Sequence, residues 1–170
     1  SAGAHAISVL TEESGFGGKL SDLQEVSQAV SIPTLRKDFI SDEYQILEAK
    51  AAGASMVLLI LAQLSKAEFQ SLYDFSKSIG LEPLVETHSA EEIAIAADSG
   101  ARLIGINTRD LETFKTDIGL FEHLAAKLPS GCVKIAESSV KQLADVKRYR
   151  DAGADCVLVG EALVTGDWAT

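Results

Sequence analysis

The sequence is poor in the residues that bind metals or form disulfides. Its 170 residues include two cysteines, three histidines, three prolines, one tryptophan and one methionine. Cys132 and Cys156 each open an apolar segment without metal-like spacing, so we expect them to be reduced thiols in the core. His5, His88 and His123 have no partner at ligand spacing, and we therefore expect no metal site.

Positive charge and long apolar runs are also scarce. Lysine and arginine number 15 against 25 aspartates and glutamates, which gives a net charge of −10 and argues against nucleic acid as a partner. No apolar run approaches the roughly 20 residues of a membrane span, and no basic flank followed by an apolar run marks a signal peptide. With 46% hydrophobic residues, the composition predicts a globular protein, and we expect no membrane partner. Reduced thiols at Cys132 and Cys156 are consistent with a cytoplasmic location.

A Gly-Ala repeat gives the chain its organisation. Four copies recur about every fifty residues, the spacing of a repeated structural unit: SAGAHAISVL at Ser1, KAAGASMVLLI at Lys50, DSGARLIGIN at Asp98 and DAGADCVLVG at Asp151. Each copy is typical of a helix that ends at glycine and leads directly into a buried strand.

Three further apolar segments, SIPTLRKDFI, EPLVETH and CVKIAES, lie between the copies of the repeat. Together they predict seven strands, near residues 5–10, 32–37, 55–60, 83–87, 102–107, 133–137 and 156–160. Helical patterns fill the intervals; in one of them Phe69, Leu72, Tyr73 and Ile79 share a face. Capping boxes predict helix starts, with the capping serine at Ser21, Ser65, Ser89 and Ser139.

Alternating strands and helices predict a parallel sheet, either open or closed. An open sheet would gather functional residues at one switch point, whereas here polar residues end several successive strands. We therefore expect an α/β fold of the (β/α)8 TIM-barrel type. No proline- or serine-rich linker divides the chain, so residues 1–170 are expected to form a single domain.

Lys37 in LRKDF, Glu86 in PLVETH and Glu137 in KIAES stand at the ends of predicted strands. Taken singly, such a lysine could pair with Asp38 or reach solvent, and such a glutamate is commonly a salt-bridge partner. Two carboxylates and a lysine at one mouth of a barrel instead favour acid–base chemistry.

Further candidates lie in the adjoining loops. Asn107 could orient a substrate, whereas Arg109 could equally form a structural pair with Asp110. Ser138, Ser139, Gly160 and Glu161 end the last two strands, where barrels often bind phosphate through backbone amides; Ser139 could also be a simple helix cap. Phe16 and Phe39 could pack on an aromatic ligand or merely cover the core.

These segments, in order and spacing, resemble indole-3-glycerol-phosphate synthase, a ribulose-phosphate-binding barrel of tryptophan biosynthesis. The resemblance rests on SVLTE, LRKDFI, VLLI, LVETH, GINTRDL, KIAES and VLVGEAL, and it spans essentially the whole chain. It implies a carboxy-lyase that closes the indole ring of 1-(2-carboxyphenylamino)-1-deoxyribulose 5-phosphate, losing carbon dioxide and water without a cofactor or metal.

The resemblance also implies roles for most of the candidate residues. Lys37 matches a general acid, Glu86 a glutamate of the later proton transfers and Asn107 an orienting amide. Phe16, Phe39 and Glu137 match substrate contacts, and Ser138 with the amides around Gly160 and Glu161 matches the phosphate site. From their places in the loops, Arg109 is added as a substrate contact and Ser139 as a phosphate contact. The resemblance leaves open fusion to, or association with, other tryptophan-pathway enzymes.

The sequence departs from the family pattern in three places. Ser139 replaces a usual glycine, at a cost of about 1 kcal/mol if the position needs a positive φ. The EESGFGG loop lacks a usual lysine and tyrosine. Nothing matches the family's first-strand motif, and the last helical segment is short, so we expect strands two to eight without the first strand and final helix. Alternatives are a truncated phosphate-binding barrel without catalysis, and another ribulose-phosphate-binding barrel such as phosphoribosylanthranilate isomerase.

Overall fold

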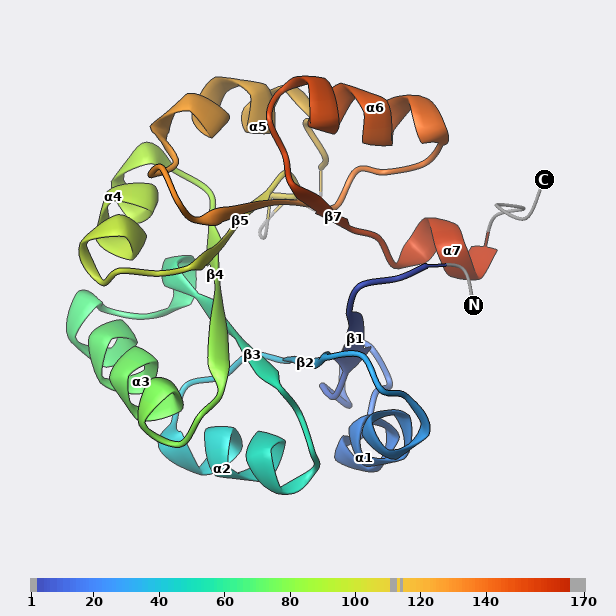
Figure 1. Ribbon diagram of the computed structural model, residues 1–170, viewed down its shortest axis with the longest axis vertical. Helices are drawn as coiled ribbons and strands as arrows, with labels where there is room; N and C mark the ends of the chain where they lie inside the picture. The colour runs from blue at the N-terminus through green and yellow to red at the C-terminus, as the bar shows by residue number, and fades with distance from the viewer. Residues whose placement is uncertain (1–2, 111–112, 114, 166–170) are drawn as a thin grey trace. The chain divides into compact units, whose positions relative to one another are not determined.

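The computed structural model describes residues 3–110, 113 and 115–165, in which parallel strands alternate with helices (Figure 1). The strands are β1 (Ile7–Leu10), β2 (Thr34–Lys37), β3 (Met56–Ile60), β4 (Glu82–Thr87), β5 (Leu103–Asn107), β6 (Val133–Glu137) and β7 (Cys156–Leu158). All seven predicted strands are confirmed. The predicted short segment at residues 166–170 lies outside the described residues.

Helices and short 3-10 turns connect the strands. The α-helices are α1 (Leu20–Ala29), α2 (Glu43–Ala51), α3 (Lys66–Ser78), α4 (Ala90–Asp98), α5 (Gly119–Leu124), α6 (Leu143–Asp151) and α7 (Glu161–Thr165). The 3-10 turns are η1 (Leu61–Gln63) and η2 (Ala125–Lys127). Among the described residues, no helix has the length and apolar character needed to cross a membrane.

The chain divides into two compact units, Ser1–Val85 and Glu86–Thr170. In the first unit β1 pairs with β2, and β2 pairs with β3, both in parallel. In the second unit β5 pairs with β6, and β6 pairs with β7, again in parallel. Within each unit the strand order therefore follows the order of the chain, so successive strands end at the same edge of the sheet.

One strand of each unit, β3 in the first and β5 in the second, is buried on both faces. In β3 the residues from Val57 to Ile60 are at most 5% exposed, and in β5 both Ile104 and Ile106 are fully buried. Such continuous burial is typical of parallel strands covered by helices. On α3 the predicted apolar face is confirmed for Phe69 and its neighbours, Leu72 and Tyr73.

Three of the four copies of the Gly-Ala repeat mark helix ends, as predicted, and the first copy begins outside the described residues. After α2, Gly53 takes a φ of +86°; its N–H donates to the carbonyl of Lys50, and the N–H of Ala54 donates to that of Ala49. This is the Schellman arrangement, which needs a left-handed residue that glycine adopts without strain. Gly100 after α4 and Gly153 after α6 repeat the pattern with positive φ.

Two of the four predicted helix caps are confirmed. The Oγ atoms of Ser65 and Ser89 accept hydrogen bonds from the first turns of α3 and α4. The caps predicted at Ser21 and Ser139 are wrong, because α1 already begins before Ser21 and α6 begins only at Leu143. Ser139 therefore lies in the loop between β6 and α6.

The expectation of core thiols is wrong, although both cysteines are free. Cys156 is exposed and Cys132 is half-buried. The reason at Cys156 is that β7 contains no buried residue. Partial burial nevertheless raises the pKa of both thiols, which disfavours the reactive thiolate at neutral pH.

Candidate active site

Three polar side chains are buried where neighbouring strands of the second unit end. Glu86 is the residue before the last one of β4, Asn107 is the last residue of β5, and Glu137 is the last residue of β6. Each of the three is at most 6% exposed. Burying a carboxylate costs free energy unless hydrogen-bond donors or positive charges compensate it. The partners of these three side chains therefore decide which chemistry the strand ends can support.

Asn107 connects the strand ends through both ends of its side-chain amide. Its Nδ2 donates to Oε1 of Glu86 at 2.9 Å. Its Oδ1 accepts from Oγ of Ser138 at 2.8 Å and from the backbone N–H of Arg109 at 3.0 Å. A flipped amide would set its oxygen against the Glu86 carboxylate and its N–H against the N–H of Arg109, so these two bonds fix the orientation. The Glu86 carboxylate thus accepts a hydrogen bond from an amide whose direction is fixed, which orients it for a role in proton transfer.

Gly105 makes room for the side chain of Glu137. A Cβ atom at residue 105 would collide with the Glu137 carboxylate, and Glu137 stands opposite Asn107 in the β5–β6 register. A glycine inside a strand is a recognisable signal of such close approach. Gly105 is thus a site-shaping residue that the sequence analysis did not assign.

His88 follows Glu86 and contacts its carboxylate. Its Nε2 lies 3.5 Å from Oε1 of Glu86, and its Nδ1 lies 3.6 Å from Oε2 of Glu92. Burial lowers the pKa of His88, but the carboxylates of Glu92, Glu86 and Asp110 together outweigh burial and raise that pKa above its ordinary value. The carboxylates on both sides of the ring therefore make His88 hold its proton more tightly than a free imidazole does. The sequence pattern raised His88 only as a possible metal ligand, and no local signal predicted its contact with Glu86.

The backbone is left-handed at two successive serines. Ser138 has a φ of +67° and Ser139 a φ of +62°, a region that costs a residue with a Cβ about 1 kcal/mol relative to glycine. Residue 139 therefore does need a positive φ, and the cost expected for serine in place of glycine applies. The turn brings the Ser138 hydroxyl back onto Asn107.

A buried hydroxyl cluster supports this turn. Oγ1 of Thr108 donates to the carbonyl of Glu137 at 2.9 Å and lies 2.6 Å from Oγ of Ser139 and 2.9 Å from the Tyr149 hydroxyl. The Tyr149 hydroxyl also donates to the carbonyl of Ser138 at 3.2 Å. Burial raises the pKa of Tyr149, so the phenol stays protonated as a donor. Thr108 and Tyr149 were not predicted as site residues.

Arg109 pairs with Glu161 rather than with Asp110. The Arg109 guanidinium lies 3.2 Å from Oε2 of Glu161, the first residue of α7. The side chains are 37% and 78% exposed, so the pair adds little stability. Asp110 instead accepts from the backbone N–H and hydroxyl of Thr113. Gly160 precedes α7, and its carbonyl accepts from the N–H of residue 163.

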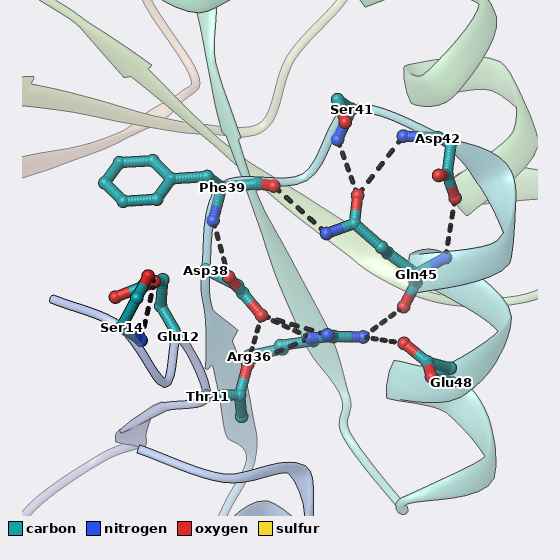
Figure 2. Close-up of polar contacts among 10 residues, drawn as sticks. All are labelled: Thr11, Glu12, Ser14, Arg36, Asp38, Phe39, Ser41, Asp42, Gln45 and Glu48. Atoms are coloured by element: carbon teal, nitrogen blue, oxygen red, sulfur yellow. Dashed lines mark hydrogen bonds and ion pairs between the residues drawn. The ribbon is translucent and has the colours of Figure 1, made fainter. Parts of the chain in front are cut away.

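Lys37 ends β2 in the first unit. Its neighbours Arg36 and Asp38 form an ion pair at 2.9 Å on one side of the strand (Figure 2). Since side chains alternate along a strand, Lys37 projects from the opposite side. The Asp38 carboxylate also accepts from the hydroxyl of Thr11 at 2.6 Å, so the pairing of Lys37 with Asp38 that the sequence left open is not the arrangement found.

Phe16 and Phe39 lie together in the first unit. Their ring centroids are 6.4 Å apart with a 44° tilt, within the range of an aromatic pair. The rings are 55% and 42% exposed, so neither serves simply to cover the core. The structure thus brings together the two aromatic candidates, and in the second unit it joins Glu86, Asn107 and Ser138 by hydrogen bonds. In the part of the chain that the structure describes, no three histidines, cysteines or acidic residues form a metal-binding cluster.

The parallel strands, their alternation with helices and the polar strand ends define an α/β protein of the TIM-barrel class. Solved structures agree. N-acetylmannosamine-6-phosphate 2-epimerase from Clostridium perfringens matches with a TM-score of 0.72 at 17% identity, over 94% of this chain and 73% of that one. A mandelate oxidase variant matches with a TM-score of 0.69 at 17% identity, over 91% of this chain and 55% of that one. At these identities the likeness concerns the fold alone.

Sequence relatives give the family. The family model described as indole-3-glycerol phosphate synthase matches residues 1–169. A protein of that name from Leifsonia xyli subsp. xyli is 56% identical over 97% of this chain and 64% of its own length. Indole-3-glycerol phosphate synthase 1 of Streptomyces coelicolor is 52% identical over 96% of this chain and 61% of its own length. The chain belongs to the indole-3-glycerol phosphate synthase family, and it spans less than two thirds of the length of these relatives.

Proposed function

We propose that this chain carries catalytic machinery for indole-3-glycerol phosphate synthesis in the tryptophan pathway. The reaction closes the ring of 1-(2-carboxyphenylamino)-1-deoxyribulose 5-phosphate with loss of carbon dioxide and water. Membership of the family supports this activity. The single observation that carries it furthest is the hydrogen bond between Asn107 and Glu86, because it holds a buried carboxylate at the strand ends in a fixed orientation.

The chemistry requires one proton donor early and further proton transfers late. In ring closure the aromatic carbon that bears the carboxylate bonds to the substrate's carbonyl carbon, and Lys37 gives the developing alkoxide its proton. Loss of carbon dioxide leaves its bonding electrons in the ring and restores aromaticity. Glu86 then serves the proton transfers by which the hydroxyl group leaves as water, and Asn107 keeps the Glu86 carboxylate in place.

The other candidates are proposed to bind the substrate. Ser138 and Ser139, with Gly160 and Glu161, contact the phosphate, through hydroxyls and backbone amides. The exposed pair of Phe16 and Phe39 packs on the anthranilate ring, which favours stacking on aromatic side chains. Glu137 and Arg109 contact the rest of the substrate.

The remaining features follow from this proposal. The reaction is acid–base chemistry, so it needs no cofactor or metal, and the partner is a small phosphorylated aromatic compound rather than nucleic acid or membrane. We propose residues 1–170 as one barrel domain of a cytoplasmic enzyme, alone or fused to or associated with other enzymes of the pathway. In the cytoplasm the two free thiols stay reduced.

Two alternative functions were left open by the sequence. A phosphoribosylanthranilate isomerase is disfavoured by the family match over residues 1–169. Such an isomerase would be expected to use a cysteine and an aspartate at strand ends, and neither Cys132 nor Cys156 ends a strand. A phosphate-binding barrel without catalysis is a real competitor, because the chain covers only 64% of its Leifsonia relative.

The test is to incubate the 170-residue chain with the carboxyphenylamino substrate and follow indole fluorescence, with the Leifsonia relative as positive control. Turnover that falls by at least about a hundredfold in Lys37→Ala and in Glu86→Gln supports the proposal. Lys66→Ala, on the exposed side of α3, and Glu82→Gln, at the opposite end of β4 from Glu86, are matched controls expected to keep the rate.

A folded chain that binds the product but does not turn over would favour the non-catalytic alternative. In that case a chimera is made in which this chain replaces the matching region of the Leifsonia relative, and the turnover of the chimera is measured. If the chimera is active and Lys37→Ala abolishes its turnover, the proposed residue roles are supported. If the chimera is active and Lys37→Ala leaves its turnover unchanged, those roles are refuted.

A further inference from the structure

A buried network lies beside the backbone of Phe39 (Figure 2) and includes Arg36 and Asp38, the sequence neighbours of Lys37. Its centre is Arg36, which is 5% exposed. The guanidinium donates to Asp38 Oδ2 at 2.9 Å from Nη2 and to the carbonyl of Gln45 at 2.6 Å from Nη1. Nη1 also lies 3.1 Å from Oε2 of Glu48. Arg36 thus joins the end of β2 to the interior of α2.

The hydroxyl of Thr11 connects this network to the end of β1. It donates to Oδ2 of Asp38 at 2.6 Å and accepts from Nε of Arg36 at 3.0 Å. Only a group that both donates and accepts can do this, and a hydroxyl is the smallest that can. The backbone makes a second tie here, because the N–H of Thr11 donates to the carbonyl of Lys37 at 3.1 Å.

The same network holds the backbone of Phe39 at both ends. Its N–H donates to Oδ1 of Asp38 at 2.8 Å, and its carbonyl accepts from Nε2 of Gln45 at 3.1 Å. Oε1 of Gln45 accepts from the N–H of Ser41 at 2.8 Å, which fixes the loop that follows. Figure 2 shows the Phe39 ring directed away from the guanidinium, free to meet Phe16.

Stability alone does not account for charges in this place. The side chains of Arg36 and Asp38 are 6% and 9% exposed, and a buried ion pair often contributes no more stability than apolar residues of similar volume. The network does provide directional hydrogen bonds that fix the backbone from Lys37 to Phe39. Lys37 is the candidate for acid catalysis, and Phe39 is a candidate for binding the aromatic ring. A reacting group misplaced by about 1 Å can cost a hundredfold in rate.

We propose that Arg36, Asp38 and Thr11 are positioning residues, which hold the Lys37 amine and the Phe39 ring in place from the opposite side of β2. This inference rests on the proposed function for the roles of Lys37 and Phe39. The positioning itself is a property of the chain that can be measured without turnover.

The test replaces Thr11 by valine, which keeps its shape and removes the hydroxyl, and by serine, which keeps the hydroxyl. Glu82→Gln removes the 2.6 Å ion pair of Lys77 and Glu82. It is the control for losing a polar interaction elsewhere in the same unit. Two readouts are taken: the kcat of the chain or of its chimera with the Leifsonia relative, and the rate at which Lys37 is acetylated as a function of pH, followed by peptide mass spectrometry.

Thr11→Val is expected to lower kcat by about tenfold or more and to change the pH profile of Lys37 acetylation. Thr11→Ser restores both, and Glu82→Gln changes neither although it also loses an interaction. If Thr11→Val lowers the melting temperature yet leaves kcat and Lys37 acetylation as in wild type, the network is structural only and the inference is overturned. If the wild type shows no turnover in either form, the proposed function fails, and the acetylation profile alone decides whether Lys37 is positioned.

Discussion

The side-chain amide of Asn107 and the carboxylate of Glu86 meet at 2.9 Å although 21 residues separate them. The contact joins the ends of β4 and β5, and both side chains are buried. Because the other end of the amide is occupied by Ser138 and by the backbone of Arg109, the donor that faces Glu86 has no alternative orientation. The pair therefore gives the sharpest test of the site.

Asn107→Asp preserves the size of the side chain but replaces the donor to Glu86 by a second carboxylate. The change removes the donor that orients Glu86 and places a like charge beside its carboxylate. We expect kcat to fall by about a hundredfold near pH 7, with a pH–rate profile altered in shape as well as height. Steady-state rates between about pH 5 and 8 check this. A variant with unchanged rate and profile would show that Glu86 does not depend on Asn107.

His88 predicts a pH-dependent contribution to stability. Its pKa is raised in the folded protein, so its contribution is fully present below the unfolded value of about 6.5 and is lost as pH rises through the folded pKa. The free energy of unfolding lost in His88→Asn should therefore be larger at about pH 5.5 than at about pH 8.5. Urea denaturation at both values measures the difference. His5→Asn, at an exposed residue of the first unit, is the matched control, and an equal loss at both pH values for His88→Asn would contradict the prediction.

The elements could be predicted because their signals are local. Gly53 and its counterparts in the repeat mark the helix ends through their own backbone conformation, and the apolar runs that follow need no distant partner to be recognised as buried strands. Strand-end residues such as Glu86 and Asn107 follow directly from those boundaries.

The side-chain partners could not be predicted in the same way. Thr108 meets Tyr149 at 2.9 Å across 41 residues of sequence, and no local pattern specifies that pair. Arg109 had Asp110 beside it in sequence and still pairs with Glu161, because loop geometry decides which acidic group is within reach. The helix cap expected at Ser139 failed for a related reason: the serine's hydroxyl lies against Thr108.

Gly105→Ala should destabilise the second unit. The added methyl group would meet the Glu137 carboxylate, and overpacking a core typically costs about 1–3 kcal/mol. Chemical denaturation measures the loss. Gly160→Ala is the control for stability, since a Cβ there meets nothing within 4 Å. Adding Glu137→Ala should recover part of the loss, because the collision partner is then removed; purely additive losses would mean that the two residues do not compete for space.

Ser139 allows its hydrogen bond to be separated from its backbone strain. Ser139→Ala removes the 2.6 Å contact with Thr108 and should cost about 1 kcal/mol. Ser139→Gly loses the same contact but relieves the positive φ of +62°, so it should be more stable than the alanine variant by about 1 kcal/mol. At the control position Ser99, φ is −77° and the hydroxyl donates to the carbonyl of Ala96, so glycine should be no better than alanine there. Thermal denaturation of the four variants decides the matter: if glycine and alanine are equally stable at position 139, the left-handed turn carries no strain, and the serine found in place of the family's glycine has no conformational cost.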